Sequence, residues 1–193
     1  MTEQAFSLVP FPTSDLPATA ITGKVSFQNN VLVLDYLLSG DITNILLPPV
    51  SHHPGRRDEL WKATCFEFFL AIKAQLGYWE FNMSPSGDWN VYRMDAYRRI
   101  GFREETGATQ LPFEIESVSD AYSLHVSVDL APIIRPEQEL QLGITAIIQT
   151  NNRNETYWAL AHPAAQADFH LRESFTLLLA GQNHPLEQSA PGA

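Results

Sequence analysis

Hydrophobic and polar residues alternate along most of this chain with a period of two, which is the pattern of β-strands that bury one face. The alternation is regular over residues 21–27, and the polar run 28–30 then supplies turn residues. A second apolar-rich segment follows over residues 31–36. We therefore predict a β-hairpin over this part of the chain.

Further strand candidates are separated by short segments that contain Gly, Pro, Asn or Asp. They cover residues 41–47, 64–72, 78–84, 88–94, 111–118, 121–130, 140–150, 155–161 and 174–180. Helical signals are limited to single turns near residues 56–61 and 129–134. About eleven short strands without a long amphipathic helix predict an all-β protein, an antiparallel β-sandwich.

Two of the predicted strands are apolar enough to lie in the middle of a sheet. Residues 64–72 form a nearly continuous apolar run, and residues 140–150 become apolar toward their end. Strands covered on both faces have this composition. Glu67 interrupts the first run, and a buried carboxylate without a partner costs several kcal/mol. We expect Glu67 to have a cation, hydrogen-bond donors or a wet cavity beside it.

The 193 residues fit one domain with two irregular ends. Residues 1–18 contain three prolines and no sustained period, which predicts an N-terminal arm. Residues 19–180 form the predicted ligand-binding domain, and the polar segment 181–193 is expected to be a disordered tail.

Twelve basic and 22 acidic residues give a net charge of −10, so nucleic acid and anionic membranes are poor partners. The single cysteine, Cys65, has no intramolecular disulfide partner. The N-terminus lacks a signal-peptide pattern, and no run of eighteen apolar residues occurs. We expect a cytoplasmic protein that does not enter a membrane, and the sequence leaves its oligomeric state open.

The densest group of polar and aromatic residues lies in 78–94. As a strand, its first part places Glu80 and Asn82 on one face and Trp79 and Phe81 on the other. Polar groups beside flat rings suit a saccharide, because C–H faces stack on rings while hydroxyls require hydrogen-bond partners. The alternative is an ordinary sheet with a solvated polar face and its tryptophans in the core.

A second group combines His162 with Asp168 and His170, which share one side of an extended segment. Two histidines and a carboxylate are ligands that a divalent metal prefers, but their spacing matches no tight zinc signature. A hydrogen-bonded cluster that holds a loop on the sheet is the alternative. The sequence has no glycine-rich phosphate loop, Gly-x-Ser-x-Gly elbow or HExxH helix.

Three segments, residues 61–70, residues 80–89, and residues 157–163 with 168–170, together resemble a group of bacterial proteins called DOMON-like. These are similar to DOMON domains and to family-9 carbohydrate-binding modules, and the resemblance covers about residues 20–180. It implies an antiparallel β-sandwich that binds a sugar or a haem in one pocket, and it implies no enzymatic activity. Sugar binders of this kind clamp the ligand between tryptophans, whereas haem binders use a methionine and a histidine.

We therefore predict a non-catalytic module that binds a saccharide or sugar-like molecule, with no catalytic residues and no cofactor. The candidate ligand-binding residues are Trp61, Glu67, Glu80, Asn82, Trp89, Trp158, His162, Asp168 and His170. The alternative is a redox protein or enzyme that uses the same pocket. It would hold haem on Met83 or Met94 with His162 or His170, or a divalent metal on His162, Asp168 and His170.

Overall fold

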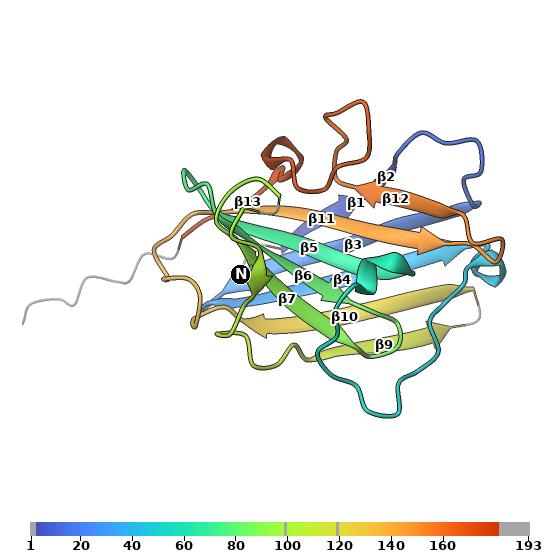
Figure 1. Ribbon diagram of the computed structural model, residues 1–193, viewed down its shortest axis with the longest axis horizontal. Coiled ribbons are helices and arrows are strands. Elements are labelled where there is room, and N and C mark those ends of the chain that lie inside the picture. The colour runs from blue at the N-terminus through green and yellow to red at the C-terminus, as the bar shows by residue number, and fades with distance from the viewer. Residues whose placement is uncertain (1–2, 99, 119, 182–193) are drawn as a thin grey trace, which may run out of the picture.

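The computed structural model describes residues 3–98, 100–118 and 120–181, which fold into two facing antiparallel sheets (Figure 1). The predicted antiparallel β-sandwich is confirmed. The first sheet has five strands. Their order is β1 (Glu3–Ser7), β3 (Thr19–Gln28), β4 (Val31–Gly40), β10 (Ala121–Asp129) and β9 (Phe113–Val118).

The second sheet carries the polar and aromatic groups that the sequence analysis singled out. Its strand order is β2 (Val9–Pro10), β12 (Glu155–Ala159), β11 (Leu140–Gln149), β5 (Cys65–Ile72), β6 (Tyr78–Met83), β7 (Trp89–Met94) and β8 (Arg103–Glu104), and β13 (Leu177–Leu179) also pairs with β11. The prediction that residues 64–72 and 140–150 form middle strands is confirmed, because β5 and β11 lie side by side within this sheet.

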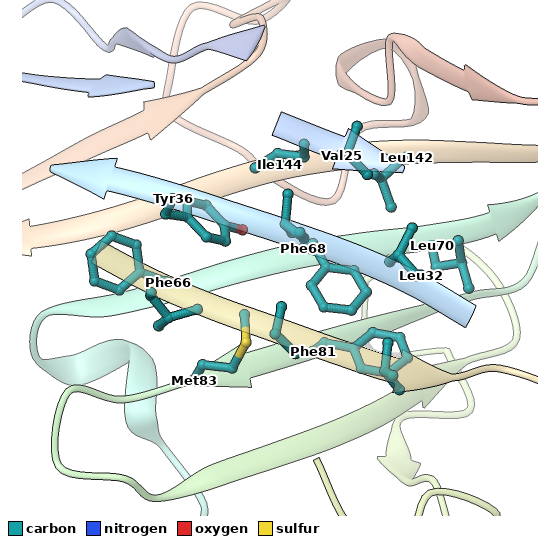
Figure 2. Packing of buried hydrophobic residues seen from close by; sticks show 14 of the residues in the cluster. Val25, Leu32, Tyr36, Phe66, Phe68, Leu70, Phe81, Met83, Leu142 and Ile144 are labelled. Atoms are coloured by element: carbon teal, nitrogen blue, oxygen red, sulfur yellow. The ribbon is translucent and has the colours of Figure 1, made fainter. Parts of the chain in front are cut away.

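The main hydrophobic core fills the space between the sheets (Figure 2). Alternate residues of the apolar strands point into it, as the period of two requires. The rings of Phe68 on β5 and Phe81 on β6 stack at a centroid distance of 4.2 Å. Tyr36 from the facing sheet donates a hydrogen bond of 2.6 Å to the backbone carbonyl of Glu67. This contact holds β5 against the opposite sheet.

Two differences from the predicted elements have physical explanations. Within residues 41–47 the chain forms a short 3₁₀ turn, η1 (Ile42–Asn44), and a single β-bridge from Ile45 to Thr150, in place of a strand. The hydroxyl of Thr43 donates to the carboxylate of Asp41, which favours a turn, and the two prolines at 48 and 49 have no N–H for a ladder. The short edge strands β1, β2 and β8 were not predicted. They raise the number of strands in the described residues to thirteen.

The predicted N-terminal arm contributes strands to both sheets, β1 to the first and β2 to the second. The predicted disordered tail lies outside the described residues from 182 onward. Two further 3₁₀ turns, η2 (Leu60–Lys62) and η3 (Arg172–Ser174), occur at the second sheet. No helix in the described part of the chain has the length and apolar character needed to span a membrane.

Candidate ligand-binding site

The outer face of the second sheet, which points away from the main core, is covered rather than solvated. In the register of β5 and β6, Glu67 lies opposite Asn82 and Phe69 lies opposite Glu80. Every residue of these two strands is buried, including those on the outer face. Phe169 from the loop after β12 packs on this face in a second apolar cluster. The alternative of a solvated polar face therefore does not apply to β5 and β6.

A cavity of about 490 Å³ lies over this outer face, within the range of small-molecule sites. Its lining combines carboxyl groups, aromatic rings and one guanidinium group. The lining residues are Asp58, Glu59, Trp61, Glu67, Phe69, Glu80, Arg98, Phe102, Ile147, Tyr157, Ala167, Asp168, Phe169 and His170. Below, we call it the outer-face cavity.

Two carboxyl groups on adjacent strands form part of the cavity floor. Glu67 is 2% exposed and Glu80 is 5% exposed. Oε1 of Glu80 accepts a hydrogen bond of 2.8 Å from Nδ2 of Asn82, and Oε2 of Glu67 accepts a long one of 3.4 Å from Thr145. Oε1 of Glu67 has no hydrogen-bond partner among the described residues. The floor therefore presents a buried acceptor that a ligand can satisfy.

Burial changes the protonation of this pair. It raises the pKa of Glu67 well above its ordinary value, and the neighbouring charge of Glu80 raises it further. Burial also raises the pKa of Glu80 to about 7, against the hydrogen bond from Asn82. At neutral pH the pair therefore retains a proton, and it can donate as well as accept hydrogen bonds.

Two groups of aromatic rings flank these carboxyl groups on the outer face, one toward β7 and the other toward β12. On the β7 side, Trp61 packs edge-on against Tyr92 at 5.7 Å, and Phe102 stacks on Tyr92 at 4.8 Å. On the β12 side, Tyr157 contacts Phe169 with a centroid distance of 6.0 Å. β11, β5 and β6 lie between β12 and β7, so the two groups of rings stand on either side of the acidic floor.

Hydrogen bonds connect the loop after β7 to the loop after β12 at one side of the cavity. Asp168 accepts a 2.5 Å hydrogen bond from the Tyr97 hydroxyl and forms a 2.8 Å ion pair with Arg98. Burial would raise the pKa of Asp168, but these two partners outweigh it and lower the pKa. The Tyr78 hydroxyl accepts from the Arg98 backbone N–H and lies 2.9 Å from Nδ1 of His170. We call this connection the loop latch.

Comparison with known proteins finds no matching family model and no matching curated protein. Solved structures do match. One is a protein of Bacteroides uniformis proposed to bind carbohydrate, with a TM-score of 0.68 and 9% identity over 89% of this chain and 83% of that one. Another is a family-9 carbohydrate-binding module of Caldicellulosiruptor kristjanssonii in complex with glucose. Its TM-score is 0.52, with 12% identity over 90% of this chain and 83% of that one.

The chain shares its fold with family-9 carbohydrate-binding modules. A complex of such a module with cellotriose, also from Caldicellulosiruptor kristjanssonii, has a TM-score of 0.50 and 12% identity over 82% of this chain and 74% of that one. The resemblance inferred from the sequence is thus supported at the level of the fold. Membership of the DOMON-like group stays a prediction.

The carbohydrate-binding-module fold brings five of the nine predicted ligand-binding residues to the outer-face cavity. They are Trp61, Glu67, Glu80, Asp168 and His170. Asn82 is not among the lining residues, but it is fully buried and its amide donates a hydrogen bond to Glu80. Burial lowers the pKa of His170 to about 4, so its imidazole is neutral at physiological pH.

The other three predicted residues do not line the cavity. Trp158 is 3% exposed in the core between the sheets, with its indole N–H bonded to Thr156. Trp89 lies under the guanidinium group of Arg56, at 4.6 Å. Nε2 of His162 lies 2.9 Å from a backbone carbonyl oxygen near the N-terminus, that of Val9.

Several lining residues were not among the predicted ligand-binding residues, for two different reasons. Tyr157 precedes Trp158 on β12 and therefore points to the opposite face, so strict alternation would have identified it. Asp58, Arg98 and Phe102 lie in loops. Loop geometry carries no period, so no pattern in the sequence indicates that these residues meet.

The residues proposed for a metal or a haem do not fit either group. No cluster of three His, Cys, Asp or Glu side chains in the described chain has the geometry to hold a metal ion. Met83 is fully buried in the core between the sheets, and Met94 is buried in the second apolar cluster. His162 and His170 each have another hydrogen-bond partner. The alternative of a metal or haem protein thus gains no support.

Proposed function

We propose that this chain is a non-catalytic module that binds a saccharide in the outer-face cavity. The observation that carries the proposal is the carboxyl group of Glu67, which is buried at the cavity floor with Oε1 unpartnered. Buried polar atoms in proteins are almost always hydrogen-bonded, so an unpartnered one in a cavity indicates a place for a ligand donor. A sugar hydroxyl is such a donor.

The rest of the cavity suits a sugar as well. Sugar rings have apolar C–H faces, and Trp61, Phe102 and Tyr157 present rings on two sides of the floor. The loop latch holds the polar lining residues Arg98, Asp168 and His170 in place, so their positions are set before a ligand binds. The similar modules of Caldicellulosiruptor kristjanssonii hold glucose and cellotriose, which agrees with this ligand class.

The affinity expected for a single sugar is low. A monosaccharide of about twelve non-hydrogen atoms at about 0.3 kcal/mol per atom gains about 4 kcal/mol, which corresponds to a Kd of about one millimolar. Longer saccharides would gain from contacts with Phe102, which is partly exposed at the cavity.

Calorimetric titration with a panel of saccharides tests the proposal. The panel contains glucose, cellotriose, N-acetylglucosamine, glucosamine and galacturonate. We expect at least one of them to bind with 1:1 stoichiometry. The substitution Trp61→Phe should weaken binding about three- to tenfold through loss of stacking area, whereas Trp89→Phe, the same change outside the cavity, should leave it unaltered.

Two results would overturn the proposal. One is the absence of binding heat for every member of the panel at millimolar protein and ligand concentrations. The other is equal weakening by Trp61→Phe and Trp89→Phe, which would place the ligand somewhere other than the outer-face cavity.

A further inference from the structure

The outer-face cavity carries a marked excess of acidic groups. Five of its described lining residues are acidic, and they are Asp58, Glu59, Glu67, Glu80 and Asp168. Arg98 supplies the one guanidinium group of this lining, and it already forms a 2.8 Å ion pair with Asp168. Glu59 pairs with Lys62 at 2.5 Å. The two floor carboxyl groups therefore have no cationic side chain bound to them in the described structure.

Glu67 provides an independent sign of a ligand group at this floor. Its side chain is buried, and Oε1 has no hydrogen-bond donor within the described chain. Oε2 accepts a long hydrogen bond from the Thr145 hydroxyl, at 3.4 Å. A donor that also carried positive charge would form a hydrogen bond to Oε1 of Glu67 and offset the electrostatic repulsion between the Glu67 and Glu80 carboxylates.

The rings around the floor favour the same kind of ligand group. A cation within about 6 Å of an aromatic face is attracted to the negative face of the ring. Trp61 and Tyr157 supply such rings on the two sides of the acidic floor. Carboxylates combined with aromatic faces are the features that recognise an ammonium group.

We propose that the saccharide bound in the outer-face cavity is an amino sugar, whose ammonium group lies against the carboxyl groups of Glu67 and Glu80. The inference rests on the proposed function and specifies its ligand class. An ammonium group stabilises the charged form of the floor carboxyl groups, which a neutral sugar cannot do, and a uronic acid would place a further carboxylate beside them.

Binding of an ammonium group should release a proton from the floor. The free site retains a proton, because burial and mutual repulsion raise the pKa of both carboxyl groups. An adjacent ammonium group stabilises their charged forms. The remaining charged or titratable groups that line the cavity are Asp58, Glu59, Arg98, Tyr157, Asp168 and His170. Cys65, Tyr78 and Tyr92 also lie near the floor, and burial raises the pKa of each of them, so they are uncharged. His170 is neutral, and Arg98 is ion-paired with Asp168 in the loop latch. Neither side chain therefore supplies the positive charge that an ammonium group would bring to Glu67 and Glu80.

The test compares glucosamine with glucose and N-acetylglucosamine by calorimetry at pH 6.5, where the amine is protonated. We expect glucosamine to bind at least about tenfold more tightly than either neutral sugar. Titrations in two buffers of different ionisation enthalpy should show proton release for glucosamine and none for glucose. Methylammonium, which has the charge without the sugar ring, should bind far more weakly than glucosamine.

Variants test whether the carboxyl groups of Glu67 and Glu80 cause the preference for glucosamine over glucose. Glu67→Gln and Glu80→Gln keep the size of the side chain and remove its charge, so each should weaken glucosamine binding several-fold more than it weakens glucose binding. Glu116→Gln on β9 removes one exposed acidic charge from the other sheet and should leave the preference unchanged.

The possible failures are distinguishable. Glucose binding as tightly as glucosamine, or a preference that survives both floor variants, would overturn the amino-sugar inference and leave the saccharide-binding proposal intact. Absence of binding for all sugars, or methylammonium binding as tightly as glucosamine, would overturn the saccharide-binding proposal and the inference together.

Discussion

At the scale of single residues, a buried carboxyl and a buried imidazole act in opposite directions on stability as pH changes. The pKa of Glu80 is raised from 4.5 to about 7, so the folded state retains a proton that the unfolded state loses. Its contribution is complete below pH 4.5 and is lost as pH rises toward 7. The pKa of His170 is lowered from 6.5 to about 4. Its contribution is complete above pH 6.5 and is lost on acidification toward 4.

Glu80→Gln separates these two effects, because His170 is present in both proteins and cancels in the comparison. The variant keeps an oxygen for the Asn82 amide and has no carboxyl group to ionise. Relative to the wild type, its free energy of unfolding should rise by on the order of 3 kcal/mol between pH 4.5 and 7.5. Urea denaturation at several pH values measures this difference. A difference that stays constant across this range would contradict the account.

Glu67 shows how far sequence reasoning reaches at the level of one residue. A carboxylate inside an apolar run was recognisable as costly, and the structure places it at a cavity with one oxygen unpartnered. The faces of Trp158 and Tyr157 follow from alternation along one strand. The role of Arg98 does not, because its loop adopts a left-handed conformation there, with φ of 55°, that no local pattern specifies.

At the scale of elements, β5 joins the hydrophobic core to the candidate site. Its inward residues contact the facing sheet, and its outward residues form part of the cavity floor. Phe68→Ala should therefore lower the free energy of unfolding by about 3–5 kcal/mol, because it removes a fully buried ring stacked on Phe81. Leu178→Ala, at a residue 56% exposed on β13, should change it by less than about 0.5 kcal/mol. Equal effects in chemical denaturation would contradict this assignment of the core.

The loop latch is the second element-scale feature, and it can be opened without removing the core. Asp168→Ala takes away the acceptor for Tyr97 and the ion pair with Arg98. We expect faster amide hydrogen exchange over residues 95–98 and little loss of global stability, since Arg98 is largely exposed. Asp35→Ala, which removes the exposed partner of His125 in the first sheet, is the matched control. Unchanged exchange over residues 95–98 would show that the latch does not position this loop.

Most strands were predictable because a period of two and apolar runs mark their positions along the chain, whereas the short edge strands and the loops carry no such pattern. β2 and β8 have two residues each, too few to show a period. The segment 41–47 has strand-like residues, yet a local hydrogen bond between Thr43 and Asp41 favours a turn. The same holds for the candidate site. Its floor lies on strands whose alternation could be read from the sequence, whereas many of its other lining residues lie in loops.

At the scale of the whole molecule, the inner faces of both sheets form the hydrophobic core, and the outer face of the second sheet carries the candidate site. The fold is shared with proteins at 9–12% identity, so packing of two amphipathic sheets defines it without many particular residues. The described residues also line a second hollow of about 320 Å³, where residues 107–112 and 130–133 meet the edge of the core. That hollow lacks the buried acidic pair and serves as the natural alternative location for a bound sugar.

A crystal structure grown with the tightest-binding saccharide of the panel tests the central claim most directly. The account predicts a sugar in the outer-face cavity, with a donor about 2.6–3.2 Å from a carboxyl oxygen of Glu67 or Glu80 and a ring of Trp61 or Tyr157 against its apolar face. A well-ordered sugar in the second hollow, or elsewhere on the surface, would contradict it.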